Sequence, residues 1–257
     1  MSTYTFPCTR LAKIMEDETR TPLVMVACGS FSPITYLHLR MFGMGNSFAY
    51  INYQEMARDY IEDLGKFELI GGYFSPVSDQ YSKEGLISAT HRTAMCQLAV
   101  DCTSDWLMVD SWESRQTEYQ PSVKVLDHFH TKLNVERNGI LTPSGHNKKV
   151  RIMLLAGGDL IESFGFPGVW DPLDLNRILG EYGCLVVERT GVDVFGTLLS
   201  NDAIYKHRRN VYVVKQLIHN DISSTKIRLF VKRGMSIKYL LPNLVIEYIK
   251  THKLYLE

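Results

Sequence analysis

Six short apolar segments, separated by stretches of helical period, constrain the fold of this chain more than any other feature. Strands without polar alternation are buried on both faces, as in a parallel sheet covered by helices on each side. The intervening segments 90–102, 119–137 and 171–180 have the spacing of amphipathic helices. The sequence therefore predicts a doubly wound parallel α/β fold, with its sites at the carboxyl ends of the strands. The apolar segments are PLVMVAC (22–28), KFELIGGYF (66–74), DWLMVD (105–110), VRIMLLAGG (150–158), GCLVVER (183–189) and NVYVV (210–214).

The end of the chain changes character and predicts a C-terminal helical segment. In SSTKIRLFVKRG (223–234), Ser223 or Ser224 can cap a helix and Gly234 can stop it. YLLPNLVIEYIKTH (239–252) then has the pattern of a closing amphipathic helix. We expect the buried positions of this second helix to include Leu244, Ile246 and Ile249.

The first apolar segment runs into the sequence GSFSPITYLH at residues 29–38, called the opening turn below. Its glycine allows a close backbone approach, and Pro33 fixes one backbone angle. Exposed amides in such a turn, followed by a helix that starts near Thr35, form an anion site. His38 lies one helical turn further on, where its imidazolium can neutralise charge that grows on a phosphoryl oxygen. The alternative is an ordinary strand-to-helix connection with an incidental histidine.

Other polar and aromatic residues follow the later strands. Lys83 is the single cation of a loop at 75–86 and can pair with a phosphate, unless it is only a solvated surface lysine. Trp112, Tyr119 and Trp170 can stack on a flat heterocycle, although aromatics in such places often belong to the core or to a lid. Asp159 can accept a hydrogen bond from a ribose hydroxyl, or cap the helix that follows, or do both.

The stretch NDISSTKIR at residues 220–228 places two hydroxyls and two cations at the start of a predicted helix. Free amides, hydroxyls and cations within five residues suit a polyphosphate. A plain helix cap is the alternative. The residues concerned are Ser224, Thr225, Lys226 and Arg228.

Composition indicates an ordinary globular protein without a global electrostatic field. The chain has 45% hydrophobic and 22% charged residues, and its 28 basic residues balance its 28 acidic ones. No overall charge therefore draws it to nucleic acid or to a membrane, and a phosphate-rich partner must be met by local groups. Five cysteines without a C-x-x-C pair favour reduced thiols in an intracellular compartment, the cytoplasm or the nucleus. No apolar run approaches the ~18 residues of a membrane span, and no histidine spacing predicts a metal site.

Taken together, these motifs resemble a known family. GSFSPITYLH is similar to the G-x-F-x-P-(H/T)-x-x-H signature of the nucleotidyltransferase superfamily, and ISSTKIR is similar to its second signature, I-S-S-T-x-x-R. The segments SPVSDQY, WES, GGDLIESF, PGVW and VERTG extend the match to the eukaryotic nicotinamide/nicotinate mononucleotide adenylyltransferases over residues 22–256. The resemblance implies transfer of the adenylyl group of ATP to nicotinamide mononucleotide or its acid analogue. The products would be NAD or its deamido form and pyrophosphate.

The resemblance also implies roles for individual residues. His38, Lys83 and Arg228 would be catalytic, and Mg²⁺ would be held mainly by the ATP phosphates, without a protein metal site. The ATP-binding residues would be Gly29, Ser30, Phe31, Thr35, His38, Ser224, Thr225, Lys226, Ile227 and Arg228. Those that contact the mononucleotide or the dinucleotide product would be Gly29, Ser30, Lys83, Trp112, Tyr119, Ser122, Gly157, Asp159, Val169, Trp170, Arg189 and Asn220.

The same resemblance implies how the chain is organised. Residues 1–21 would be an N-terminal extension, and residues 22–257 one Rossmann-like nucleotidyltransferase domain. Within this domain, GMGNSFAYINYQ (43–54) interrupts the family pattern. It is either a loop that protrudes from a split first helix or translated intron sequence. The polar segment 134–149 would be a mobile loop. A homo-oligomer is possible, and no nucleic-acid partner is expected.

Two departures and two alternatives accompany this interpretation. Tyr119 stands where relatives often carry Trp, and Glu84 follows Lys83 where a basic or neutral residue is usual. The first alternative is another phosphorylated acceptor, such as a pantetheine or glycerol phosphate, against which the ring platforms Tyr119 and Trp170 argue. The second is a chaperone-like or scaffolding protein that has lost catalysis, against which the intact His38 argues.

Overall fold

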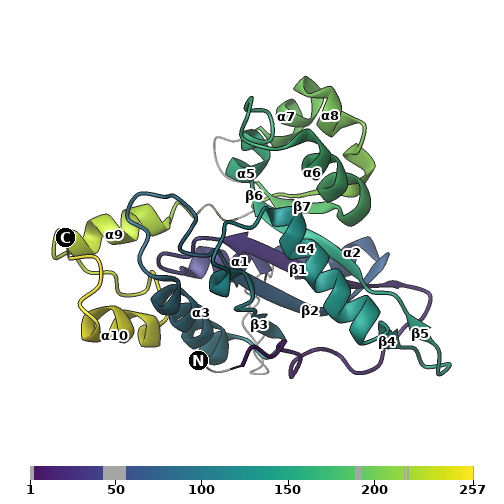
Figure 1. Ribbon diagram of the computed structural model, residues 1–257, viewed down its shortest axis with the longest axis horizontal. Coiled ribbons are helices and arrows are strands. Elements are labelled where there is room, and N and C mark those ends of the chain that lie inside the picture. Colours follow the sequence, from purple (N-terminus) through teal and green to yellow (C-terminus); the bar gives the residue numbers. More distant parts are fainter. Residues whose placement is uncertain (1–2, 43–55, 189–192, 217, 219, 257) are drawn as a thin grey trace.

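The computed structural model describes residues 3–42, 56–188, 193–216, 218 and 220–256 (Figure 1). Among these residues the central sheet has six parallel strands, in the order β3-β2-β1-β6-β7-β8. Each predicted strand is present, so the doubly wound α/β prediction is confirmed. The strands are β1 (Thr21–Gly29), β2 (Phe67–Pro76), β3 (Leu107–Val109), β6 (Arg151–Gly157), β7 (Cys184–Val187) and β8 (Val211–Val214).

The strand order reverses at the centre of the sheet, between β1 and β6. The chain moves outward from β1 to β2 and β3, then returns to β6 on the other side of β1 and moves outward again to β8. In an open α/β sheet, ligands bind outside the carboxyl ends of the strands at such a reversal. Gly29 of β1 and Gly157 of β6 therefore mark the place to look for a site.

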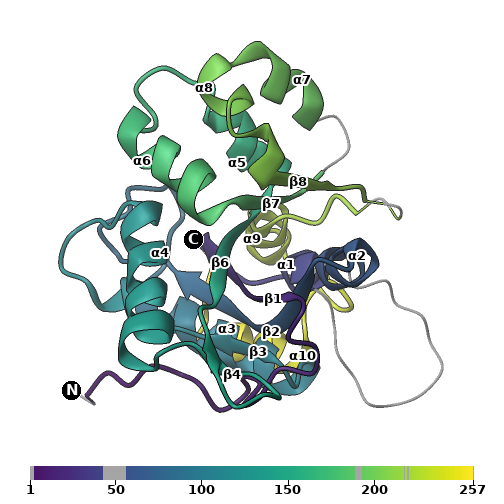
Figure 2. The same cartoon turned by 90° about the vertical axis from the view of Figure 1, so that its right-hand side faces the viewer.

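Successive residues of β1 face two different cores, as the period of a strand requires. Leu23 and Met25 belong to one buried cluster, and Val24 and Val26 to the other. Figure 2 shows α1 and α2 on one side of the strands and α4 on the other. The first face is covered by α1 (Tyr36–Phe42), α2 (Met56–Leu64), α3 (Ala89–Thr103) and the C-terminal helices. The second is covered by α4 (Ser122–His130), η2 (Thr131–Glu136), α5 (Gly158–Ser163), α6 (Pro172–Arg177), η3 (Ile178–Tyr182), α7 (Val194–Ser200) and α8 (Asp202–Tyr205).

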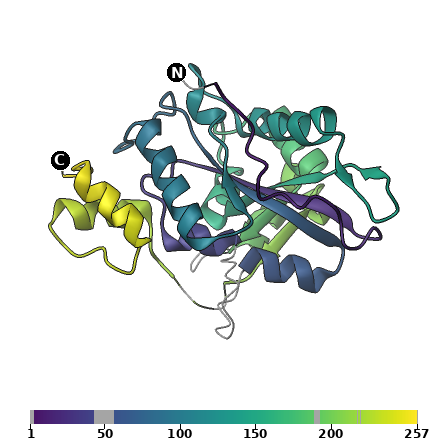
Figure 3. The same cartoon turned by 90° about the horizontal axis from the view of Figure 1, so that it is seen from below.

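The C-terminal segment forms the two predicted helices at one end of the molecule (Figure 3), and the second of them packs against α3. The first, α9 (Ser224–Lys232), is capped by the Ser223 side chain and ends before Gly234, whose φ is +66°. The second, α10 (Asn243–Thr251), buries Val245, Ile246 and Ile249. The prediction that Leu244 is buried is wrong, since this side chain is 42% exposed. Pro242 occupies the N-cap position, and Val245, in place of Leu244, joins Ile246 and Ile249 on the buried face.

Two segments differ from their sequence predictions. The helix expected over 119–137 begins only at Ser122, because Pro121 occupies its cap position. The segment 134–149 is not an irregular loop: β4 (Ile140–Leu141) and β5 (Asn147–Lys148) form a small antiparallel hairpin. The buried Asn134 side chain fixes its base, since Nδ2 donates to Val150 O at 2.8 Å and Oδ1 accepts from Val150 N at 2.7 Å.

The 43–54 insertion lies outside the described residues, but the helices on either side of it are well packed. Phe42 of α1 and Met56 of α2 are buried in the same core cluster. The N-terminal segment also packs on the domain, with Phe6 stacked on Tyr73 at 5.4 Å. The proposed domain boundary at residues 21 and 22 stays a prediction. Within the described part of the chain, no helix has the length and apolar character needed to cross a membrane.

Candidate active site

A cavity of about 500 Å³ opens at the carboxyl ends of β1, β2 and β6. It lies where the strand order reverses, and residues from both halves of the sheet line it. The sequence-predicted site residues that it brings together are Gly29, Ser30, Phe31, His38, Lys83, Tyr119, Ser122, Gly157, Asp159, Trp170, Ser224 and Thr225.

A second, polar groove of about 560 Å³ lies at the amino ends of β1 and β6, lined in part by Thr21, Arg151 and Arg177. Arg177 is already paired there, because it donates to the two carboxylate oxygens of Asp127 at 2.6 and 3.1 Å. Ligands of open α/β sheets bind at the opposite ends of the strands. The cavity at the carboxyl ends is therefore the candidate active site.

The backbone of the opening turn is shaped by Phe31. This residue has φ +42° and is only 5% exposed, with its ring edge-on to Phe74 at 5.1 Å. Its ring also lies against Gly29, where an added Cβ would come within 2.9 Å of it. Gly29 is therefore required by the close approach of the Phe31 ring, which keeps the turn folded back over the end of β1.

The imidazole of His38 is oriented by Thr35. The buried Thr35 donates its backbone N–H to His38 Nδ1 at 3.0 Å, and its hydroxyl lies 2.8 Å from the same nitrogen. A backbone N–H only donates, so Nδ1 is the acceptor and this assignment places the ring proton on Nε2. Thr35 thus fixes the orientation of the ring in the cavity that His38 lines, and the role predicted for the imidazolium stays a prediction.

The two signature segments are in direct contact. The Ser224 hydroxyl donates to Pro33 O at 2.8 Å, and the Arg228 guanidinium donates to Ser32 O at 3.0 Å. The Ser32 hydroxyl in turn lies 3.1 Å from the Tyr255 hydroxyl. Segments about 190 residues apart therefore form one unit at the rim of the cavity.

Sequence reasoning missed Arg92, which connects three loops of the site. This α3 residue is fully buried, and its guanidinium donates to Ser30 O at 3.0 Å, Val77 O at 2.6 Å and Ile87 O at 2.8 Å. A buried charge of this kind is stable only when its hydrogen bonds are satisfied. Nothing in the sequence separates it from an ordinary helix arginine, because its partners, the three loop carbonyls and the Asp79 carboxylate, lie outside its helix.

Lys83 brings a positive charge to the cavity, and the charge of Arg228, which lies outside the cavity lining, acts on it. Lys83 Nζ donates to Ser30 Oγ at 3.4 Å. Partial desolvation of the ammonium group, and then the positive charge of Arg228, lower the pKa of Lys83. Within the described part of the chain, no carboxylate forms an ion pair with either side chain. An anion bound between them would relieve this repulsion.

Aromatic residues line the opposite side of the cavity. Tyr119 stacks on Tyr81 with ring centroids 5.9 Å apart and is 49% exposed. Trp170 is held in place by Ser163, to whose hydroxyl its indole N–H donates at 3.0 Å. Gly157 is the cap residue of α5, so Asp159 lies in the first turn of that helix and is not its cap. Two aromatic rings and a nearby carboxylate suit a flat polar ligand.

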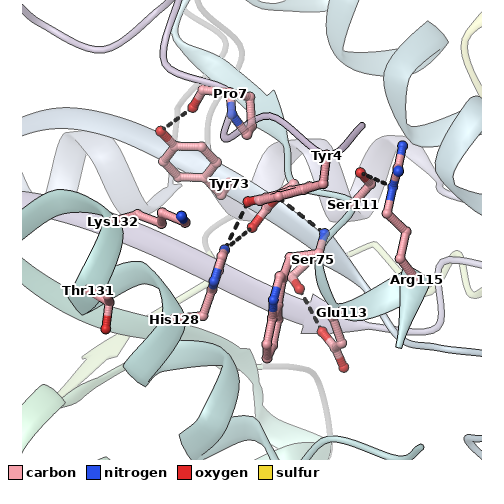
Figure 4. A network of polar contacts seen from close by, with 12 residues as sticks. Tyr4, Pro7, Tyr73, Ser75, Ser111, Glu113, Arg115, His128, Thr131 and Lys132 are labelled. Carbon is pink, nitrogen blue, oxygen red and sulfur yellow. Dashed lines mark hydrogen bonds and ion pairs between the residues drawn. The ribbon is translucent and has the colours of Figure 1, made fainter. Parts of the chain in front are cut away.

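The remaining predicted site residues lie outside the cavity lining. Trp112 stacks on His128 at 4.4 Å, and His128 is hydrogen-bonded to Asp110 and, as Figure 4 shows, to Tyr4. Ile227 is buried in the core, and Asn220 accepts from the backbone N–H of Ile222. These positions neither establish nor exclude a contact, so their ligand roles stay predictions. Thr35 is buried, and Lys226 and Val169 are exposed. Arg228 donates a hydrogen bond to the opening turn. Arg189 lies outside the described residues.

A carboxyl group that the sequence did not single out also lines the cavity. Glu113 is 3% exposed and accepts from the Ser75 hydroxyl at 2.6 Å. Burial raises the pKa of this carboxyl to about 8. The motif WES contains it, but the motif alone does not reveal that the glutamate is buried.

The fold and the cavity define a protein of the doubly wound α/β class with a candidate site at the carboxyl ends of its strands. A family model described as cytidylyltransferase-like matches residues 48–230. The chain is 40% identical over 269 residues to nicotinamide/nicotinic acid mononucleotide adenylyltransferase 1 of Bos taurus, covering 94% of this chain and 91% of that protein. It therefore belongs to the nicotinamide/nicotinic acid mononucleotide adenylyltransferase family, within the cytidylyltransferase-like proteins, and the predicted resemblance is confirmed.

Two further comparisons bear on length and fold. The chain is 58% identical over 253 residues to nicotinamide/nicotinic acid mononucleotide adenylyltransferase 2 of Saccharomyces cerevisiae, covering 98% of this chain but only 61% of that protein. It thus spans about three fifths of that relative's length. A solved structure described as Plasmodium falciparum nicotinic acid mononucleotide adenylyltransferase complexed with APC matches with a TM-score of 0.59 and 18% identity, covering 91% of this chain and 96% of that one. At this identity the match concerns the fold.

Proposed function

We propose that this protein transfers the adenylyl group of ATP to nicotinamide mononucleotide or nicotinate mononucleotide, giving the dinucleotide and pyrophosphate. The observation that carries the proposal is the joined pair of signature segments at the cavity rim. Ser224 and Arg228 hold the opening turn that presents His38, while Lys83 reaches the same turn through Ser30. Hydroxyls, backbone amides and cations are thus gathered in one place, as a polyphosphate requires.

The proposed reaction needs no covalent intermediate on the protein. An oxygen of the mononucleotide phosphate attacks the α-phosphorus of ATP in line and forms the new P–O bond. The bond from that phosphorus to the oxygen bridging to the β-phosphorus breaks, and pyrophosphate leaves with the electron pair. Positioning and stabilisation of charge are then the whole task of the protein.

Each side chain at the rim has one part in this scheme. Lys83 holds the acceptor phosphate near Ser30. His38 donates from Nε2 to a non-bridging oxygen of the α-phosphoryl group as charge develops there. Thr225 and Arg228 contact the departing pyrophosphate, whose negative charge offsets the repulsion between the Lys83 and Arg228 cations.

Magnesium enters this proposal with the substrate. Among the described residues no group of three His, Cys, Asp or Glu side chains is placed to hold a metal ion. The donor set at the cavity rim is instead made of hydroxyls and cations, which suit phosphates and not Mg²⁺. The protein therefore binds Mg–ATP through its phosphates, and the residues described here do not fit a resident metal.

The aromatic side of the cavity favours a pyridine nucleotide as the acceptor. Tyr119 and Trp170 present flat surfaces, and Ser122 lines the same cavity and offers a hydroxyl to the ring substituent. A pantetheine or glycerol phosphate has no ring for these platforms. The packed α1, which carries His38, likewise favours an enzyme over a scaffolding protein without catalysis.

A product assay tests this proposal directly. Purified protein is incubated with ATP, Mg²⁺ and either mononucleotide, and the dinucleotide and pyrophosphate are quantified. We expect both products in equal amounts. Absence of dinucleotide with both acceptors would contradict the proposal, and product from pantetheine phosphate alone would favour the alternative acceptor.

Two broader expectations belong to the same proposal. All five cysteines are free thiols, which supports a reducing compartment, the cytoplasm or the nucleus. A homo-oligomer is proposed on the resemblance alone. Localisation of a tagged chain and sedimentation of the purified protein measure these two properties.

A further inference from the structure

The buried carboxyl of Glu113 has a hydrogen-bonding oxygen to offer a ligand. The Ser75 hydroxyl donates to Oε2 at 2.6 Å, while Oε1 has no hydrogen-bond partner among the residues that the structure describes. Figure 4 shows the second oxygen pointing away from Ser75. The side chain is 3% exposed, and Glu113 is part of the cavity lining. A bound ligand is therefore the natural partner for Oε1.

The surroundings of Glu113 bring the pKa of its carboxyl group close to neutral pH. Burial raises its pKa to about 8, while the Ser75 hydrogen bond and the Arg92 charge lower the pKa and the Asp110 charge raises it. The thiol of Cys28, at the end of β1, also faces this carboxyl, and the Glu113 charge raises the pKa of that thiol. Glu113 is thus mostly protonated at neutral pH and ionised in mildly alkaline solution.

The cavity brings Glu113 together with aromatic residues. Glu113 lines the same cavity as Tyr119, Ser122 and Trp170, which are the proposed frame of the pyridine ring. Burial, the neighbouring Tyr81 and then the Glu113 charge raise the pKa of Tyr119. The pyridine substituent is the part of the mononucleotide that differs between the amide and the acid.

We propose that Glu113 hydrogen-bonds the substituent of the pyridine ring and sets the preference between the amide and the acid acceptor. This inference rests on the proposed function. A protonated Glu113 donates its O–H to the carbonyl oxygen of the amide or to the carboxylate of the acid. An ionised Glu113 still accepts from the N–H of the amide but repels the carboxylate of the acid. The protein then accepts both substrates at neutral pH and discriminates against the acid as the pH rises.

The ratio of kcat/KM for the amide to kcat/KM for the acid isolates this effect. Both acceptors carry the same phosphate and meet the same Lys83 and His38, so the titration of those groups cancels in the ratio. We expect the ratio to be flat below about pH 7 and to rise by roughly tenfold between pH 7 and pH 9, as one proton is lost from a group of this pKa.

Three variants assign the rise to Glu113. In Glu113→Gln the side chain does not titrate, so the ratio should stay flat from pH 6.5 to 9.5. In Ser75→Ala the hydrogen bond that lowers the pKa of Glu113 is lost, so the rise should move to higher pH. Glu118→Gln is the matched control, since Glu118 is exposed in the same segment, and it should follow the wild type.

The outcomes separate this inference from the proposed function. If neither acceptor yields dinucleotide, both fail. If both acceptors react but the wild-type ratio is flat with pH, or rises equally in Glu113→Gln, the proposed function stands and the role of Glu113 is overturned. A rise that keeps its midpoint in Ser75→Ala also overturns it, and this readout remains available should Glu113→Gln fold poorly.

Discussion

Replacing Arg92 with methionine tests how the loops of the site are held together. The methionine fills much of the same volume but leaves Ser30 O, Val77 O and Ile87 O without their donor. Hydrogen bonds to a charged group each contribute about 1.5–3 kcal/mol. Because the opened loops can regain some water, we take the lower end and expect the free energy of unfolding to fall by roughly 4–5 kcal/mol. That is a large part of the stability of an ordinary domain.

Urea denaturation followed by far-ultraviolet circular dichroism measures this loss. The slope with denaturant should stay constant while the midpoint falls. Arg20→Met is the control, since Arg20 pairs with Asp17 on the surface, and it should cost about 0.5 kcal/mol or less. Arg92→Lys should remain well below the wild type, because one ammonium cannot reproduce the planar guanidinium fork. A loss below about 1 kcal/mol in Arg92→Met would refute the view that this side chain ties the loops together.

Three further predictions concern single groups. His38→Ala should lower kcat by about 10²–10³-fold, since a donor aimed at developing charge contributes ~3–4 kcal/mol. An unchanged steady-state kcat would remove His38 from the mechanism. Ser224→Ala loses the hydrogen bond to Pro33 O and should destabilise by about 1 kcal/mol in urea, with equal stability speaking against that contact. The folded-state pKa of Glu113 is raised from 4.5 to about 8, so the folded protein binds more protons than the unfolded chain between these two values. The free energy of unfolding should therefore fall as the pH rises through this window and level off above it. Each pKa unit corresponds to ~1.4 kcal/mol, and thermal unfolding of Glu113→Gln should show a weaker decline, whereas identical pH profiles would contradict the assignment.

The sheet could be predicted from the sequence because its signal is local. Each strand is a short apolar run, and burial on both faces removes the alternation that would otherwise obscure it. The phase of α10 could not be predicted in the same way. Leu244, Val245 and Ile246 are consecutive apolar residues, and only packing against α3 decides which of them is buried.

The site was predictable in part, through the two signature segments. Their contact, with Ser224 bonded to Pro33 O, joins residues 191 positions apart, which no local pattern contains. Arg92 and Glu113 escaped prediction for a related reason. Their roles depend on burial and on partners in other segments, such as Ser30 O and the Ser75 hydroxyl. The tautomer of His38 likewise follows from the direction of a single backbone N–H.

The most direct test of the proposed activity follows the phosphorus atoms of ATP. ATP carrying a label in its α-phosphoryl group is incubated with the protein, Mg²⁺ and nicotinamide mononucleotide, and the label is traced. The label should appear entirely in the dinucleotide, in equal amount to unlabelled pyrophosphate, with none bound to the protein. Label that stays in a mononucleotide product, or that becomes attached to the protein, would contradict direct adenylyl transfer at this site.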